Sequence, residues 1–206
     1  MTLGEKFEKV ADIVYDKGYE AFENYLRDCD SFQYFFADDR NNHLLELWKE
    51  DYTQNAVELK RMFNSSKDLV IAPRISANKC ESCIYMFYNC SNLTTIPYLY
   101  VERYEINFVS AFRGCSKLES ITFDGIIQND IDFQYCPLLS VESMINIITH
   151  LVNTKGEEEE YRWTLTFTDE CWERLEESGK PCDSGLTDDA TMTWQNYVTE
   201  VLCWNI

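Results

Sequence analysis

Apolar residues recur at fixed spacings in the middle of the chain, and this pattern predicts how that part folds. Four segments align without gaps, and each has a Phe, then a Cys or Ser, then a Leu at equal steps. They read FNSSKDL from Phe63, FYNCSNL from Phe87, FRGCSKL from Phe112 and FQYCPLL from Phe133. One such unit cannot bury its own apolar face, so we expect stacked copies with Phe on Phe, Cys on Cys and Leu on Leu.

Within the third unit the pattern changes from a turn to a strand. The stretch from Ala111 to Cys115 is expected to form a short helical turn, and Leu118 to Phe123 a strand. Because side chains alternate along a strand, Ile121 and Phe123 should point inward while Ser120 and Thr122 face outward.

The segment MFYNCSNLTTIP and the similar segment AFRGCSKLESITF resemble BspA-type leucine-rich repeats, in which Met-Phe and a Cys recur before a Leu-x-x-Ile strand. The resemblance covers residues 62 to 140 and implies an α+β fold. Its centre would be a short leucine-rich-repeat solenoid of four repeats, flanked by N-terminal and C-terminal helical caps. The expected regions are an N-terminal helical region (1–60), the repeat ladder (61–140) and a C-terminal capping α/β region (141–206). Such ladders serve mostly as recognition surfaces, so the motif says more about fold than about function.

The two ends of the chain carry a second resemblance. VADIVYDKGYEAFENYL and TWQNYVTEVLCWNI resemble the ends of repeat proteins encoded beside tail or baseplate genes in phages and prophages of gut bacteria. Residues 31–60 depart from that pattern because they are unusually aromatic and acidic. The resemblance implies a virion component that binds other virion proteins or a host-surface protein or glycan. It transfers no functional residue.

Helical periodicity predicts the elements on either side of the repeats. Residues 5–28 should form an amphipathic helix, either packed on the repeats or self-associating as a coiled coil. Ser140 can cap a helix that closes the end of the repeats, and Thr168 can cap another. Trp163 to Phe167 alternates like a strand, and a last helix should run from about Thr193 to Cys203.

Charge narrows the range of partners. The chain of 206 residues has 18 Lys and Arg against 36 Asp and Glu, a net charge of -18. Such a surface repels phosphate backbones and anionic lipids, so nucleic acid and membrane insertion are not expected. No signal peptide or apolar span is visible, which points to a virion protein made in the host cytoplasm or, alternatively, to the bacterial cytoplasm. The nine cysteines should then be reduced and behave as small buried hydrophobes.

Candidate chemistry is sparse. Cys80 and Cys83 form a C-x-x-C that could be a zinc or redox site, but no second pair or nearby His completes it, so two packing residues are expected. Neither of the two histidines has catalytic or metal-binding spacing. Asp169 and Glu173 could pair as acid and base, but a solvated helix face is the simpler interpretation. The sequence therefore predicts a non-enzymatic protein without metal or cofactor, and an enzyme with an unrecognised site is the weakest hypothesis.

Tyrosines and small polar residues mark the predicted contact surface. The residues are Tyr98, Tyr100, Tyr104, Thr95, Ser120 and Thr122. Exposed Tyr supplies contact area at low entropic cost, whereas buried Tyr is core, and both interpretations stay open here. Four repeats offer too little area for tight monovalent binding, so we expect a homo-oligomer or part of a larger assembly. The alternative is an intracellular bacterial protein–protein interaction module of the same fold.

Overall fold

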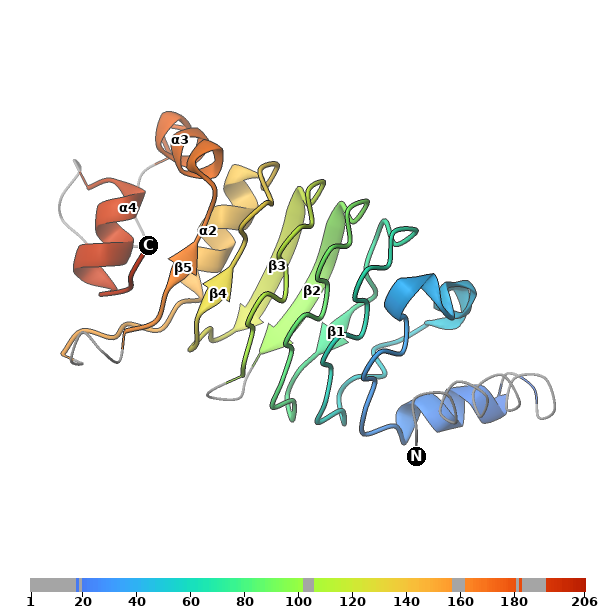
Figure 1. Cartoon of the computed structure of the whole chain (residues 1–206). Coiled ribbons are helices and arrows are strands. Elements are labelled where there is room, and N and C mark those ends of the chain that lie inside the picture. Colours follow the sequence, from blue (N-terminus) through green and yellow to red (C-terminus); the bar gives the residue numbers. More distant parts are fainter. Residues whose placement is uncertain (1–17, 19, 102–105, 157–161, 181, 183–191) are drawn as a thin grey trace.

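The computed structural model describes residues 18, 20–101, 106–156, 162–180, 182 and 192–206. Its strands form a three-stranded parallel sheet, ordered β1-β2-β3, and a separate two-stranded parallel sheet, β4-β5. The strands are β1 (Ile75–Ser76), β2 (Thr95–Val101), β3 (Ser120–Gly125), β4 (Ile131–Asp132) and β5 (Leu165–Thr166). Figure 1 shows them side by side along an elongated body, with helices at either end.

The predicted fold class, an α+β leucine-rich-repeat solenoid with helical caps, is wrong. The structure is mixed α/β, and its strands are divided between two small parallel sheets instead of forming one solenoid. The physical reason lies in the fourth repeated segment. After Phe133 the chain enters helix α2 (Val141–Thr149), whereas the third segment leads into β3. The helix-capping signal at Ser140 and the apolar stripe behind it outweigh the strand pattern, so the first sheet ends at β3.

The helices agree in part with the sequence predictions. Among the described residues, the helical elements are residues 20–27, η1 (Ala37–Asp39), η2 (Asn42–Leu47), α2, α3 (Asp169–Glu177), α4 (Trp194–Asn196) and the π-helical η4 (Tyr197–Val201). Both predicted caps are confirmed, because the hydroxyls of Ser140 and Thr168 accept hydrogen bonds from backbone amides at the start of α2 and α3. Most of the predicted helix 5–28 lies outside the described residues, but Phe22 and Leu26 are buried as its pattern requires. No helix in the described part of the chain has the length and apolar character needed to cross a bilayer.

The predicted column of phenylalanine rings is confirmed. Centroid distances are 5.1 Å between Phe63 and Phe87, 6.0 Å between Phe87 and Phe112, and 4.8 Å between Phe112 and Phe133. The rings are within 20° of parallel and fully buried. The repeated leucines Leu69, Leu93, Leu118 and Leu139 are buried as well. Phe36, which the sequence pattern missed, continues the column 5.0 Å from Phe63.

The predicted helical turn from Ala111 to Cys115 is wrong. Residues two positions before and two positions after Phe63, Phe87 and Phe112 have a left-handed backbone, with φ of 52° at Ser110 and 82° at Gly114. Alternate backbone amides bond to the next segment, as in Phe87 N–H to the carbonyl of Ala111 at 2.8 Å, and the amides between them close single turns, as in Cys115 N–H to the carbonyl of Phe112 at 3.2 Å. Hydrogen bonds between successive segments therefore hold these turns in parallel register.

Candidate binding surface

A bulge in β2 positions two of the predicted tyrosines. The register between β2 and β3 shifts between Ile96 and Leu99. Pro97 lies in this interval, where a residue without an N–H can be tolerated in a strand. Beyond the bulge alternation resumes, so Leu99 is buried while Tyr98 and Tyr100 are only half-buried. Their rings are 8° from parallel, with centroids 6.4 Å apart.

A cation and an acid hold Tyr98 in place. The guanidinium carbon of Arg74 lies 4.0 Å from the centroid of the Tyr98 ring. The Tyr98 hydroxyl donates a hydrogen bond to Oδ2 of Asp124 at 3.2 Å. Burial and the neighbouring Asp124 carboxylate raise the pKa of Tyr98, so the phenol remains a donor at neutral pH. We call Arg74, Tyr98, Tyr100 and Asp124 the sheet-face cluster.

A row of polar residues crosses the sheet through this cluster. Ser76 is the register partner of Tyr100, and Tyr100 is the partner of Asp124. At the β1 side, the Ser76 hydroxyl donates to the carboxylate of Asp51. A carboxylate therefore lies at each end of the row, with the aromatic rings and one guanidinium between them. Such a surface can donate, accept and pack against a flat apolar group, which are the contacts needed to bind a polar protein surface or a sugar.

The structure brings most of the predicted contact residues to one face. Thr95 and Ser120 are register partners on the outer side of β2 and β3. Thr122 is exposed two residues after Ser120 in β3, on the same face as Tyr98 and Tyr100. The residues placed together are thus Thr95, Tyr98, Tyr100, Ser120 and Thr122, whereas Tyr104 lies outside the described residues.

Sequence reasoning missed Arg74 and Asp124. The signal for Arg74 was present, because it follows Phe63 by the same number of residues as Tyr98 follows Phe87. Aligning the polar positions of the repeats, and not only the apolar ones, would have predicted that the Arg74 guanidinium stacks on the ring of Tyr98. The position of Asp124 beside Tyr98 could not be predicted from the repeat, because the bulge shifts β2 against β3 by one residue.

The tryptophans near the C-terminus lie in or against the core, and the acidic residues of α3 face solvent. Trp172, Trp194 and Trp204 are buried in the core, and Trp163 is partly buried against it. Asp169 and Glu173 are exposed on α3, as the solvated-face interpretation predicted. With two more carboxylates and Trp172 they line a surface groove of about 400 Å³ between α3 and α4.

The C-x-x-C pair is internal. Cys80 and Cys83 are both fully buried, and their Sγ atoms are 3.7 Å apart. A hydrogen bond from the Cys83 thiol lowers the pKa of Cys80, and the same bond raises the pKa of Cys83. The described residues contain no group of three or more His, Cys, Asp or Glu arranged to hold a metal ion.

Comparison with known proteins identifies no relative. No protein-family model, curated protein or solved structure matches the chain. The function is therefore inferred from the geometry of the sheet-face cluster and from the sequence resemblances. Of these, only the geometry identifies particular residues.

Proposed function

We propose that this protein binds a partner through the sheet-face cluster without turning it over, as a structural or recognition component of a larger assembly. The observation that carries the proposal is the contact of Tyr98 with both Arg74 and Asp124. Tyr and Arg are the side chains most often responsible for binding energy at interfaces. Because each is fixed by its neighbours on a sheet, little rotamer entropy is lost when a partner binds.

The assembly we propose is a phage tail or baseplate, and the partner another virion protein or a host-surface protein or glycan. This part of the proposal is supported by the resemblance of the chain ends to proteins encoded in phage tail modules. Many copies on one particle would raise the avidity of a weak site by orders of magnitude without new contacts.

Purified particles test the assembly. A prophage carrying the gene is induced, particles are isolated by density gradient, and an antibody against the chain is used to detect it. We expect the chain to band with the particles at several copies each. If the chain stays in the cell lysate while tail proteins band normally, the virion role is wrong, and an interaction module inside the bacterium takes its place.

Cell adsorption tests the surface. Labelled wild-type protein and the double variant Tyr98→Ala, Tyr100→Ala are compared for binding to host cells, with a thermal melt of each. We expect adsorption to fall about tenfold or more, the loss of roughly 1.4 kcal/mol or more of binding energy. Glu173→Ala, on the exposed face of α3, is the control and should adsorb normally. Unchanged adsorption with a lowered melting temperature would show that the two rings are core.

A further inference from the structure

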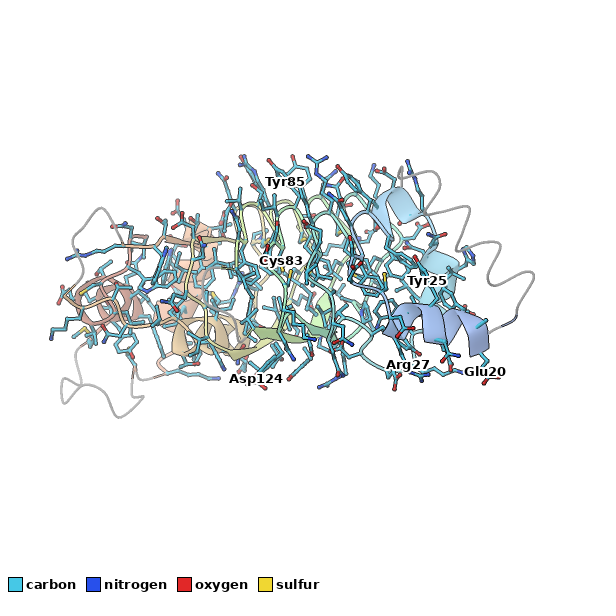
Figure 2. The ribbon with its side chains drawn as sticks, turned by 90° about the horizontal axis from the view of Figure 1, so that it is seen from below. Glu20, Tyr25, Arg27, Cys83, Tyr85 and Asp124 are labelled. Carbon is cyan, nitrogen blue, oxygen red and sulfur yellow. The ribbon has the colours of Figure 1, made fainter. Side chains whose placement is uncertain are left out.

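Three neighbouring stretches of the chain together carry positive charge and no negative charge. The stretches 60–67, 84–92 and 109–117 contain no Asp or Glu, although the chain as a whole has 36 acidic side chains. Their cations are Lys60, Arg61, Lys67, Arg113 and Lys117. We call these three stretches the turn edge. Figure 2 shows Tyr85, from the turn edge, and Asp124, from the sheet-face cluster, projecting from opposite sides of the stacked segments.

The cations of the turn edge form no ion pair with the acidic residues that the structure describes. Arg61 instead lies between two rings, with its guanidinium carbon 5.4 Å from the centroid of Tyr34 and 5.0 Å from that of Tyr85. Its Nη1 donates a hydrogen bond to the neutral Tyr34 hydroxyl at 2.6 Å. Arg113 lies 5.3 Å from the ring centroid of Tyr135 in the same manner. Aromatic rings hold these guanidinium groups in position and leave their full charge available.

The backbone fixes the direction of the Arg61 and Tyr85 side chains. Arg61 and Tyr85 occupy the same position in successive segments, with φ of 58° and 56°. The amide of Arg61 bonds to the carbonyl of Ile84 at 2.9 Å, and that of Tyr85 to the carbonyl of Val109 at 3.1 Å. A left-handed backbone is costly for residues other than Gly and persists only where surrounding contacts determine it. The stacked Tyr and Arg side chains are therefore preorganised.

The chemistry of the turn edge fits an acidic protein segment. Besides Tyr and Arg it presents short polar side chains, namely Asn64, Ser65, Asn89, Ser91 and Asn92. Tyr, Ser, Asn and Arg are the residues favoured on protein-binding surfaces that must be both rigid and adaptable. The ring of Tyr85 has Arg61 against it and Tyr88 edge-on at 5.3 Å, so sugar rings have little free face to pack on. Guanidinium groups bind carboxylates through paired N–H donors.

We infer that the turn edge is a second interaction surface, which binds an acidic protein segment whose Asp and Glu carboxylates pair with Arg61 and Arg113. This goes beyond the proposed function, because the surface lies opposite the sheet-face cluster and shares no residue with it. Charge complementarity selects the partner. A long polyanion such as nucleic acid would be repelled by the net charge of -18, whereas a short acidic segment can be matched to the turn edge alone.

Fluorescence anisotropy with a short fluorescein-labelled oligoglutamate peptide tests the inference on the full chain. Arg113→Gln and Arg74→Gln each remove one positive charge, the first from the turn edge and the second from the sheet face. We expect Arg113→Gln to weaken binding several-fold, the double variant Arg61→Gln, Arg113→Gln to weaken it about tenfold or more, and Arg74→Gln to change it less than about twofold. Binding should weaken as salt is raised, since the contacts are charged. Melting curves confirm that all variants fold.

Four outcomes would overturn the inference. The first two are an absence of binding at low salt and an equal loss of affinity with Arg74→Gln, which would mean attraction by overall charge. The third is tighter binding of a uronate polysaccharide or a single-stranded oligonucleotide than of oligoglutamate, sensitive to the same variants, which would replace the protein segment by that ligand. The last is a mass that rises with concentration in light scattering and returns to the monomer value in the double variant, which would identify a second copy of this chain as the occupant.

Discussion

The repeated cysteine has a more specific role than the small hydrophobe that the sequence indicated. The side chain three residues after each column Phe donates a hydrogen bond to the carbonyl of the Phe one segment earlier. The pairs are Ser66 with Phe36, Cys90 with Phe63, Cys115 with Phe87 and Cys136 with Phe112. The sulfur distances are 2.9 to 3.0 Å, and the thiols are free. A Ser can replace the Cys in the first segment because only a small donor is needed.

Exchanging the donor at Cys90 should show which property matters. We expect Cys90→Ser to lower the free energy of unfolding by less than about 1 kcal/mol, because a hydroxyl can reach the Phe63 carbonyl as Ser66 reaches Phe36. Cys90→Ala leaves that buried carbonyl with one partner fewer and opens a small cavity, so a loss of about 1–3 kcal/mol is expected. Urea denaturation at pH 7 measures both. Equal losses for the two variants would contradict a donor role.

The same thiol should make stability depend on alkaline pH. Burial raises the pKa of the Cys90 thiol from its ordinary value of about 9 to about 12. A raised folded pKa means that the stabilisation is complete below pH 9 and is lost as pH rises from 9 towards 12. Cys90→Ser does not titrate there, so its free energy of unfolding should fall less steeply over this range than that of the wild type. Parallel pH curves would contradict the assignment.

At the scale of elements, helix α2 replaces a strand along the edge of β3. The Ser143 hydroxyl accepts from Ile121 N–H at 3.0 Å. The Asn146 side chain accepts from Phe123 N–H at 2.7 Å and donates to the Phe123 carbonyl at 3.2 Å. Unpaired N–H and carbonyl groups at the edge of a sheet can pair with a strand of another chain. Here the side chains of Ser143 and Asn146 form hydrogen bonds with those groups instead. This arrangement ends the first sheet.

Removing the amide of Asn146 should expose its role at this edge. Asn146→Leu has a similar size but leaves the N–H and carbonyl of Phe123 without these partners, so we expect a loss of about 2–4 kcal/mol in unfolding free energy. Hydrogen exchange at the Phe123 amide should also accelerate. Thr149→Ala, at an exposed position of the same helix, should change stability by less than about 0.5 kcal/mol. Unchanged exchange at Phe123 would contradict the pairing.

Sequence patterns predicted the existence of α2 but not its partner. Ser140 and the apolar spacing identified the helix, since capping and periodicity are local properties. Asn146 and Ser143 belong to no apolar stripe, and a polar residue on a helix is ordinarily assigned to solvent. Ser143 is nevertheless buried, because its contact is with β3, more than twenty residues away in the chain. That contact explains why the predicted solenoid was wrong even though Phe, Cys and Leu were placed correctly.

For the whole molecule, the sequence predicted the position of some residues of the sheet face but not of others. Alternation placed Ser120 and Thr122 outward correctly, because it depends only on strand geometry. Arg74 and Asp124 required the register between strands, which a bulge alters. The turn edge was missed for another reason. Net charge averages over the chain and hides a basic surface confined to three short stretches.

The phenylalanine column connects the two ends of the molecule, and its centre is the place to test that connection. The ring of Phe112 is fully buried and contacts Phe87 and Phe133 on either side. Truncation to Ala removes these contacts and leaves a cavity that the stacked backbone cannot close, so we expect Phe112→Ala to cost about 3–5 kcal/mol in unfolding free energy. Tyr135→Ala removes a ring of similar size that is 54% exposed, and should cost less than about 1 kcal/mol.

Urea denaturation followed by tryptophan fluorescence can compare these variants, because Trp48 lies near one end of the column and Trp172 near the other. If the column couples the unfolding of the two ends, both ends of Phe112→Ala should unfold at the same urea concentration, lower than that of the wild type. Variants that each keep a single tryptophan, at one end or the other, would report the two transitions separately. A loss well under about 1 kcal/mol, or one no larger than that of Tyr135→Ala, would mean that the centre of the column contributes no more than a surface ring. The rigid support that both the sheet-face cluster and the turn edge require would then have to come from the backbone hydrogen bonds between segments alone.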